Sequence, residues 1–143
     1  MTYLNLIEQE FPNLKNSYYK ETSKATSQYN CIAWAININN KRYWPNNIDY
    51  FWPDNISNSQ KIESFIKLFN KEGYYQCDDS EYEEGFEKIC LYTLNNVPKH
   101  AARQTKNGNW TSKLGDEIDI EHTITGLVGN WYGNPTLFFK KKL

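Results

Sequence analysis

A cysteine, a histidine and a polar partner occur in this sequence in an order that favours acyl chemistry. Cys31 follows the turn-forming residues 27–30 and begins the apolar run CIAWAIN. Asn30 is a good helix N-cap, so the thiol is expected in the first helical turn, where free backbone N–H groups and the dipole favour a thiolate. The same N–H groups could hold an oxyanion. The alternative is a small buried residue that packs the helix start.

The sequence contains two histidines, and a thiol nucleophile needs one of them as its base. His100 is the better candidate because it opens the strand-like run HAARQ, so it is expected at a strand end that faces loops. The alternative is a solvent-exposed histidine at that position. His122 follows the acidic run EIDIE, which favours an exposed surface histidine over a third member of the site. A solvated loop is expected for the nearby acidic residues Asp116, Glu117, Asp119 and Glu121.

The other two cysteines, Cys77 and Cys90, complete an odd number without C-x-x-C spacing. This pattern predicts neither a disulfide framework nor a zinc ribbon. Cys90 lies inside the run KICLY and is expected in the core, and Cys77 is expected at a strand end near acidic side chains that raise its pKa. A metal site built from Cys31, His100 and His122 is a weaker alternative because these ligands lack compact spacing. The predicted chemistry requires no metal or cofactor.

Bulk composition limits the class of protein. The 143 residues, 39% of them hydrophobic, suit one globular domain over residues 1–143. A formal net charge of −1 argues against nucleic-acid and anionic-membrane partners, which require a concentrated basic face. The N-terminal residues do not resemble a signal peptide, and no apolar run is long enough to span a membrane. A cytoplasmic protein is therefore expected, with export without a conventional signal peptide as the alternative.

Apolar periodicity and turn residues predict helices first and strands later. A short helix is expected over residues 3–10, irregular or weakly extended chain over 16–29, and a short buried helix from Cys31. The clearest helix runs from about Ser59 to Glu72, with a Ser57/Gln60 capping pair and Gly73 as its stop. Strands are expected over residues 74–77, 86–94, 99–105, 109–114 and 136–142, with a tight turn at Asn107-Gly108. This order predicts an α+β fold with helices packed on one face of an antiparallel sheet.

The order of these residues resembles the papain-like cysteine hydrolases in their minimal NlpC-type form. Those enzymes open the catalytic helix with Tyr-Asp-Cys, and Tyr29-Asn30-Cys31 is similar, with Asn in place of Asp. They carry a third polar residue about a dozen positions after the histidine, where this chain has Ser112. A serine orients an imidazole less firmly than an amide or a carboxylate, so Gln104, Asp119 and His122 stay open as alternatives. The resemblance implies a papain-like domain.

The motifs NCIAWA, GFEKICLY, HAARQ, WTSKLG and IEH, with two Trp-Pro pairs, are also similar to an uncharacterised bacterial family of small domains. The papain-like resemblance implies a hydrolase or acyl transferase in which His100 deprotonates Cys31 for attack on an amide or peptide bond. Its substrate is expected to be a peptide, a peptidoglycan fragment or a protein. Tyr29, Trp34 and Gln104 are candidates for substrate or oxyanion contacts. The competing hypothesis is a non-enzymatic immunity or adaptor domain whose aromatic loop RYWPNNIDYFWP forms an interface.

Overall fold

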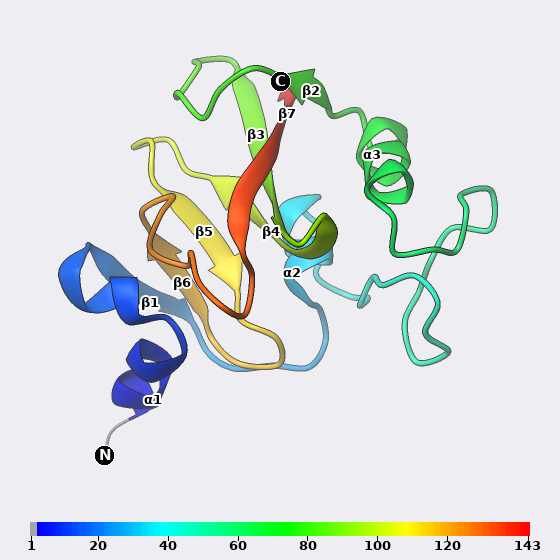
Figure 1. The fold of residues 1–143 in the computed structure, drawn as a ribbon. Coiled ribbons are helices and arrows are strands. Elements are labelled where there is room, and N and C mark those ends of the chain that lie inside the picture. The colour runs from blue at the N-terminus through cyan, green and yellow to red at the C-terminus, as the bar shows by residue number, and fades with distance from the viewer. Residues whose placement is uncertain (1–2) are drawn as a thin grey trace.

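The computed structural model describes residues 3–143 and is built on a seven-stranded antiparallel sheet (Figure 1). The strands lie in the order β1-β6-β5-β4-β3-β7-β2. The helices are α1 (Tyr3–Glu10), the 3-10 helix η1 (Pro12–Asn16), α2 (Cys31–Ala35) and α3 (Ile62–Lys71). The strands are β1 (Tyr19–Ser23), β2 (Tyr75–Cys77), β3 (Phe86–Leu94), β4 (Val97–Gln104), β5 (Trp110–Lys113), β6 (Asp119–His122) and β7 (Asn134–Lys142). The α+β class predicted from the sequence is confirmed.

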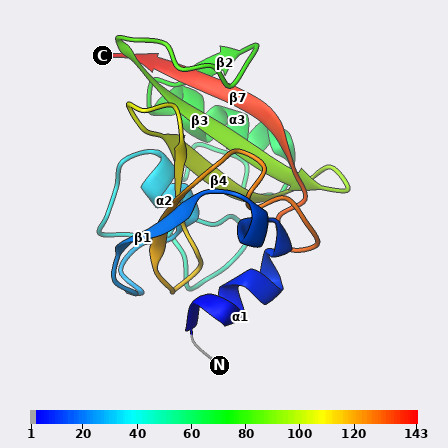
Figure 2. The same ribbon diagram turned by 90° about the vertical axis from the view of Figure 1, so that its left-hand side faces the viewer.

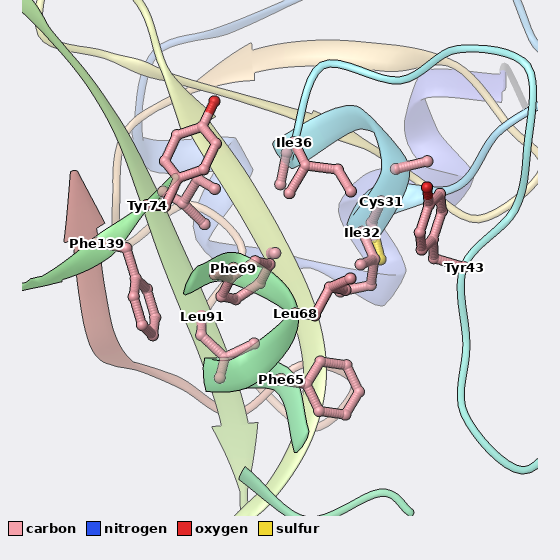
Figure 3. Packing of buried hydrophobic residues seen from close by; sticks show 14 of the residues in the cluster. Cys31, Ile32, Ile36, Tyr43, Phe65, Leu68, Phe69, Tyr74, Leu91 and Phe139 are labelled. Carbon is pink, nitrogen blue, oxygen red and sulfur yellow. The ribbon is translucent and has the colours of Figure 1, made fainter. Parts of the chain in front are cut away.

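The strand β3 is buried on both of its faces, and this decides where the helices lie. Ile89 and Leu91 pack with α2 and α3 in one hydrophobic core (Figure 3), here named the α3-side core. Cys90 and Tyr92 pack with Ile7 of α1 in a second one, the α1-side core. Figure 2 shows α3 behind the sheet and α1 in front of it. The expectation that the helices pack on one face is therefore wrong, because a nearly continuous apolar strand needs cover on both faces.

The two helices with clear sequence signals form, although one begins differently from the prediction. α2 starts at Cys31, and the side chain of Asn30 caps it by accepting from the Ala33 N–H. α3 starts at Ile62, and its N-cap residue makes no side-chain cap bond, so the Ser57/Gln60 capping pair is wrong. Gly73 follows the helix with a φ of +91°, as expected of a helix stop.

The turns confirm one prediction and show one that the sequence analysis missed. Gly108 has a φ of +89° in the β4–β5 connection, where the Thr105 N–H donates to the Asn109 carbonyl at 2.8 Å. The tighter turn joins β3 to β4 through Asn95 and Asn96, whose φ values are +52° and +67°. Asparagine tolerates this left-handed region better than other residues that carry a Cβ, so two asparagines can replace the usual glycine.

Strand β6 lies where a solvated loop was expected, and strand β1 lies in the segment expected to be irregular or weakly extended. Asp119 and Glu121 belong to β6 and are buried, so the solvated-loop prediction is wrong for them. Ile120 fills the α1-side core, while Asp119 on the other face accepts from the Tyr29 hydroxyl at 2.7 Å. Asn107 and Asn109 both donate to Glu121 Oε2 at 3.2 Å. These polar partners reduce the cost of burying acidic residues in a strand, although Asp119 Oδ1 has no partner within residues 3–143.

The sheet opens between β4 and β5, and the opening positions the site described below. The two strands share only two register pairs, Arg103 with Thr111 and Gln104 with Trp110. Residues 100–102 of β4 therefore have no partner on β5, although β5 continues alongside β6 for its full length. Within residues 3–143, no helix is both long and apolar enough to cross a membrane.

Candidate active site

Cys31 occupies the first turn of α2 and packs in the α3-side core, with 8% of its surface exposed. The backbone N–H groups of Ala101, Ile32 and Cys31 itself stabilise a thiolate here, as does the charge of Lys113. Burial outweighs all of these contacts and raises the pKa of the thiol to about 11. The expectation of a thiolate favoured by the helix start is therefore wrong for the protein without substrate, in which Cys31 is a neutral thiol at pH 7.

His100 lies in the middle of β4, because the strand begins three residues earlier, at Val97. The expected strand-end position, in both its loop-facing and its exposed form, is wrong, since the side chain is fully buried. The Tyr132 ring lies flat on the imidazole, with centroids 4.0 Å apart and planes 4° apart. Tyr92 contacts it edge-on with a centroid distance of 5.4 Å. Two aromatic rings thus hold the imidazole in one orientation.

His100, Ser112 and His122 form a chain of hydrogen bonds in the α1-side half of the molecule. His100 Nε2 and Ser112 Oγ lie 2.8 Å apart, and Ser112 Oγ and His122 Nε2 lie 2.7 Å apart. His122 Nδ1 then contacts the Thr123 carbonyl oxygen at 2.7 Å. Ser112 thus meets His100, as the resemblance implied, and His122 joins them as the next member. The exposed surface position favoured for His122 is wrong, because its side chain is fully buried.

The Thr123 carbonyl determines the direction of every hydrogen bond in this chain. A carbonyl only accepts, so His122 Nδ1 carries a proton and the neutral ring offers its Nε2 lone pair. Ser112 donates its hydroxyl proton to that nitrogen, and its oxygen then accepts from the Nε2–H of His100. Neutral His100 consequently has no proton on Nδ1. This nitrogen is buried and has no hydrogen-bond partner within residues 3–143, so its lone pair is free to take a proton.

Both imidazoles are neutral in the folded protein. Burial lowers the pKa of His100 well below its ordinary value, and the neighbouring His122 lowers it further. Burial also lowers the pKa of His122 to about 4, although the Thr123 carbonyl and Glu121 partly oppose this change. A neutral imidazole with a free lone pair is the form that a general base requires.

These two buried histidines predict a loss of stability in weak acid. Below the ordinary histidine pKa of 6.5 the unfolded chain binds two protons that the folded chain does not, so stability falls as pH falls. Urea unfolding should show a decrease of about 2 to 3 kcal/mol between pH 6 and pH 5. His122→Gln, which keeps one donor and one acceptor, should remove about half of this dependence. A free energy of unfolding that is constant over this pH range would show that the histidines titrate normally when folded.

Cys31 and His100 lie on opposite sides of β4, next to the opening of the sheet. His100 faces the α1-side core with Tyr92, whereas Cys31 belongs to the α3-side core. The thiol nevertheless interacts with the backbone N–H of Ala101, the residue that follows His100. Tyr132 stacks on His100 and lines the same cavity as Cys31. The structure shows no hydrogen bond between the thiol and His100 Nδ1.

A cavity of about 360 Å³ gives access to the thiol. Asn30, Cys31, Trp44, Asn47, Tyr50, Lys99, Gly115, Asp116 and Tyr132 line it. Trp44 comes from the aromatic loop and packs its ring against Phe65 of α3, with centroids 5.4 Å apart. The aromatic loop therefore both covers the core and forms a wall of this cavity.

The remaining predicted contact residues do not line this cavity. The Tyr29 hydroxyl donates to Asp119, and the Trp34 ring nitrogen donates to Thr111 Oγ1 at 3.1 Å. The Gln104 amide donates to the Ser80 carbonyl at 2.8 Å. Trp34 and Gln104 line a separate cavity of about 560 Å³. The predicted substrate and oxyanion contacts of these three residues receive no support, since each polar group is used within the fold.

Tyr132 is the site residue that the sequence analysis missed. It lies in the segment GNWYG, where Gly129 and Gly133 exchange backbone hydrogen bonds of 2.9 and 3.1 Å. A Cβ on Gly133 would lie 1.9 Å from the Thr93 carbonyl oxygen, so only glycine fits there. The two glycines were a local signal for a tight loop, but nothing in their spacing pointed to His100.

Comparison with known proteins places the chain in a family. The family described as "Domain of unknown function (DUF7689)" matches residues 20–140. The chain belongs to this family. The match includes Cys31, His100, Ser112 and His122 and begins after α1. No curated protein and no solved structure matches the chain. Within residues 3–143, no group of three or more His, Cys, Asp or Glu side chains is placed to hold a metal ion.

Proposed function

We propose that the protein is a cysteine-dependent hydrolase or acyl transferase that acts on an amide or peptide bond through Cys31 and His100. The observation that carries the proposal is the free lone pair on the buried Nδ1 of His100. A buried nitrogen without a partner is costly, and such atoms are typical of groups that work on a ligand. The hydrogen bonds to Ser112 and His122 keep this nitrogen unprotonated in the absence of substrate.

The first half of the proposed reaction forms an acyl-enzyme. As the Cys31 sulfur attacks the carbonyl carbon, its proton moves to His100 Nδ1, a C–S bond forms, and the carbonyl π electrons move to oxygen. The N–H groups of Cys31 and Ile32 at the start of α2 face the reacting sulfur and suit the oxyanion. When the C–N bond breaks, His100 returns the proton to the leaving amine. A thioester on Cys31 remains.

The second half releases the acyl group. Water or an amine attacks the thioester carbonyl and gives its proton to His100. The C–S bond then breaks as His100 passes this proton to the sulfur, which restores the thiol of Cys31. Because the thiol pKa is about 11 and that of His100 is low, proton transfer accompanies attack and does not precede it. Peptides, peptidoglycan fragments and protein glutamine side chains are the substrates that this chemistry accommodates.

The α+β architecture supports the finer proposal of a papain-like, NlpC-type domain. The cysteine begins a helix that packs on the sheet, the histidine lies on β4 and its polar partner Ser112 on β5. Asn30 departs from the Asp of those enzymes for a local reason. Its amide nitrogen donates to the Tyr43 carbonyl at 2.7 Å, which a carboxylate could not do. The three free thiols suit a reducing compartment, so we also propose a cytoplasmic location.

A non-enzymatic binding domain is the second candidate, and the burial of Cys31 favours it. A thiol that is 8% exposed with a pKa of about 11 is typical of a structural cysteine. The aromatic loop also presents Ile48 at 99% exposure beside Phe51 at 41%, an arrangement that suits contact with another protein. This candidate predicts that no acyl group transfers to Cys31.

Reaction with p-nitrophenyl acetate separates the two candidates. If Cys31 is the nucleophile, the purified protein should release a burst of about one p-nitrophenolate per chain, and mass spectrometry should find the acetyl group on Cys31. Cys31→Ala should abolish the burst, while Cys77→Ala, which removes another thiol, should retain it. Acetylation confined to surface lysines would contradict the enzyme and support the binding domain.

A further inference from the structure

A second cavity adjoins the one at Cys31. It has a volume of about 370 Å³ and shares Gly115, Asp116 and Tyr132 with the first cavity. Its remaining walls are Tyr3, Leu6, Ile7 and Glu10 of α1, with Phe11, Leu114, Glu117 and Trp131. Because the two cavities share these lining residues, they are neighbours, and an extended substrate bound at the thiol has the second cavity beside it.

Apolar and aromatic side chains at the second cavity are unusually exposed. The exposed fractions are 59% for Trp131, 47% for Leu6 and 39% for Tyr3. Exposed side chains of this kind, gathered around a cavity, are typical of a surface that binds a ligand. They suit the methylene groups of a long side chain.

The charged groups that line this cavity are all acidic. They are Glu10, Asp116 and Glu117, and no lysine, arginine or histidine of the described chain joins them in the lining. Asp116 pairs with Arg42 at 3.8 Å, and Glu117 accepts from the Tyr3 hydroxyl at 2.6 Å. Lys113, behind the wall, donates to the Glu117 backbone carbonyl. Part of the negative charge is therefore already offset.

Glu10 is the carboxylate that remains available. It forms no hydrogen bond or ion pair with any residue of the described range 3–143. Burial and the hydrogen bond from Tyr3 to Glu117 raise the pKa of Tyr3 most, and the charge of Glu10 adds a smaller effect. The raised pKa of Tyr132 comes first from burial, then from Cys31 and then from Glu10. The charge of Glu10 therefore affects the hydroxyl groups of Tyr3 and Tyr132, two residues that line the second cavity. A cation bound in the second cavity would meet this charge and the face of the exposed Trp131 ring.

We propose that the second cavity binds the lysine or arginine side chain of a peptide or protein substrate whose acyl group is presented to Cys31. The proposal rests on the proposed function, because it assigns a neighbouring subsite to the same reaction. The methylene groups of the substrate side chain pack against Leu6 and Trp131, and its cationic end pairs with Glu10. The subsite makes the protein selective for basic sequences. Its α1 wall lies outside residues 20–140, which match the family.

Peptidyl chloromethyl ketones test the selectivity directly. The Cys31 sulfur displaces chloride, so a C–S bond forms, a C–Cl bond breaks, and the thiol proton leaves through His100. Acetyl-Ala-Lys chloromethyl ketone should label Cys31 about tenfold faster than the norleucine analogue, and the glutamate analogue should be slowest. Glu10→Gln should reduce the preference for lysine over norleucine to about threefold or less. Glu21→Gln, the same change of charge on the exposed strand β1, should leave all three rates unchanged.

A binding measurement on Cys31→Ser separates failure of the subsite from failure of the chemistry. N-acetyl-lysine methylamide should shift the Trp131 indole N–H resonance at lower concentration than N-acetyl-norleucine methylamide does. Equal labelling rates for the three ketones would overturn the subsite and leave the proposed function intact. If Cys31 reacts with none of them, the proposed function fails, and the indole titration decides the subsite: a shift selective for lysine supports it, and equal shifts overturn it.

Discussion

Alkylation of Cys31 should be nearly independent of pH in the wild-type protein, and replacing His100 with glutamine should make it depend on pH. A thiol of pKa about 11 is only about 10⁻⁴ ionised at pH 7, so without a base its rate should rise tenfold per pH unit up to about pH 11. With neutral His100 as base, the rate should be nearly constant from pH 7 to 9, since the low pKa of His100 keeps its lone pair free throughout. At pH 7 we expect wild-type protein to react about 10² to 10⁴ times faster than His100→Gln.

The measurement is the rate of iodoacetamide incorporation at the Cys31 peptide, followed by mass spectrometry. Glutamine retains an amide that can donate to Ser112, so the variant removes the base and keeps the hydrogen bond. Ser112→Ala is the matched variant for the relay: it keeps the imidazole but removes the hydrogen bond that determines its tautomer, and should give an intermediate rate. Identical pH profiles for wild type and His100→Gln would contradict the assignment of His100 as the base.

Among the substitutions proposed for this protein, Asn30→Ala should cause the largest loss of stability. The Asn30 side chain accepts from the Tyr43 N–H at 3.0 Å and from the Ala33 N–H at 3.3 Å, and donates to the Tyr43 carbonyl at 2.7 Å. All three bonds are buried, so the variant leaves backbone groups without partners. We expect the free energy of unfolding to fall by about 3 to 5 kcal/mol in urea titrations at pH 7.

Two further variants test whether the amide of Asn30 is the cause. Asn55→Ala, at an exposed position of the same long loop as Tyr43, should change the free energy of unfolding by less than about 0.5 kcal/mol. Asn30→Asp keeps the cap acceptor but turns an oxygen toward the Tyr43 carbonyl, and should cost about 1 to 3 kcal/mol. A fully stable Asn30→Asp protein would show that the donated bond is unimportant, and the departure from the Tyr-Asp-Cys pattern would need another explanation.

The sequence alone determined those features of the fold that depend on residues adjacent in the chain, such as helix starts, strand bounds and turns. Asn30 before an apolar run predicted the start of α2, and the alternating and apolar residues of β3 predicted its bounds, Phe86–Leu94. Gly73 and Gly108 predicted positions of positive φ, because glycine adopts them without a steric cost. Cys31, His100 and Ser112 were chosen by residue type and order along the chain. Local signals of this kind need no knowledge of the tertiary structure.

The tertiary structure decided burial, protonation and the meeting of distant groups. The sequence of β6 predicts an acidic loop because its stabilising partners, Tyr29 and Asn107, lie elsewhere in the chain. The neutral thiol of Cys31 follows from desolvation, which exceeds the effect of the helix start and has no sequence pattern. The free lone pair of His100 depends on the Thr123 carbonyl, three hydrogen bonds away. Sequence order suggested which groups could react, and only packing determined which proton each one carries.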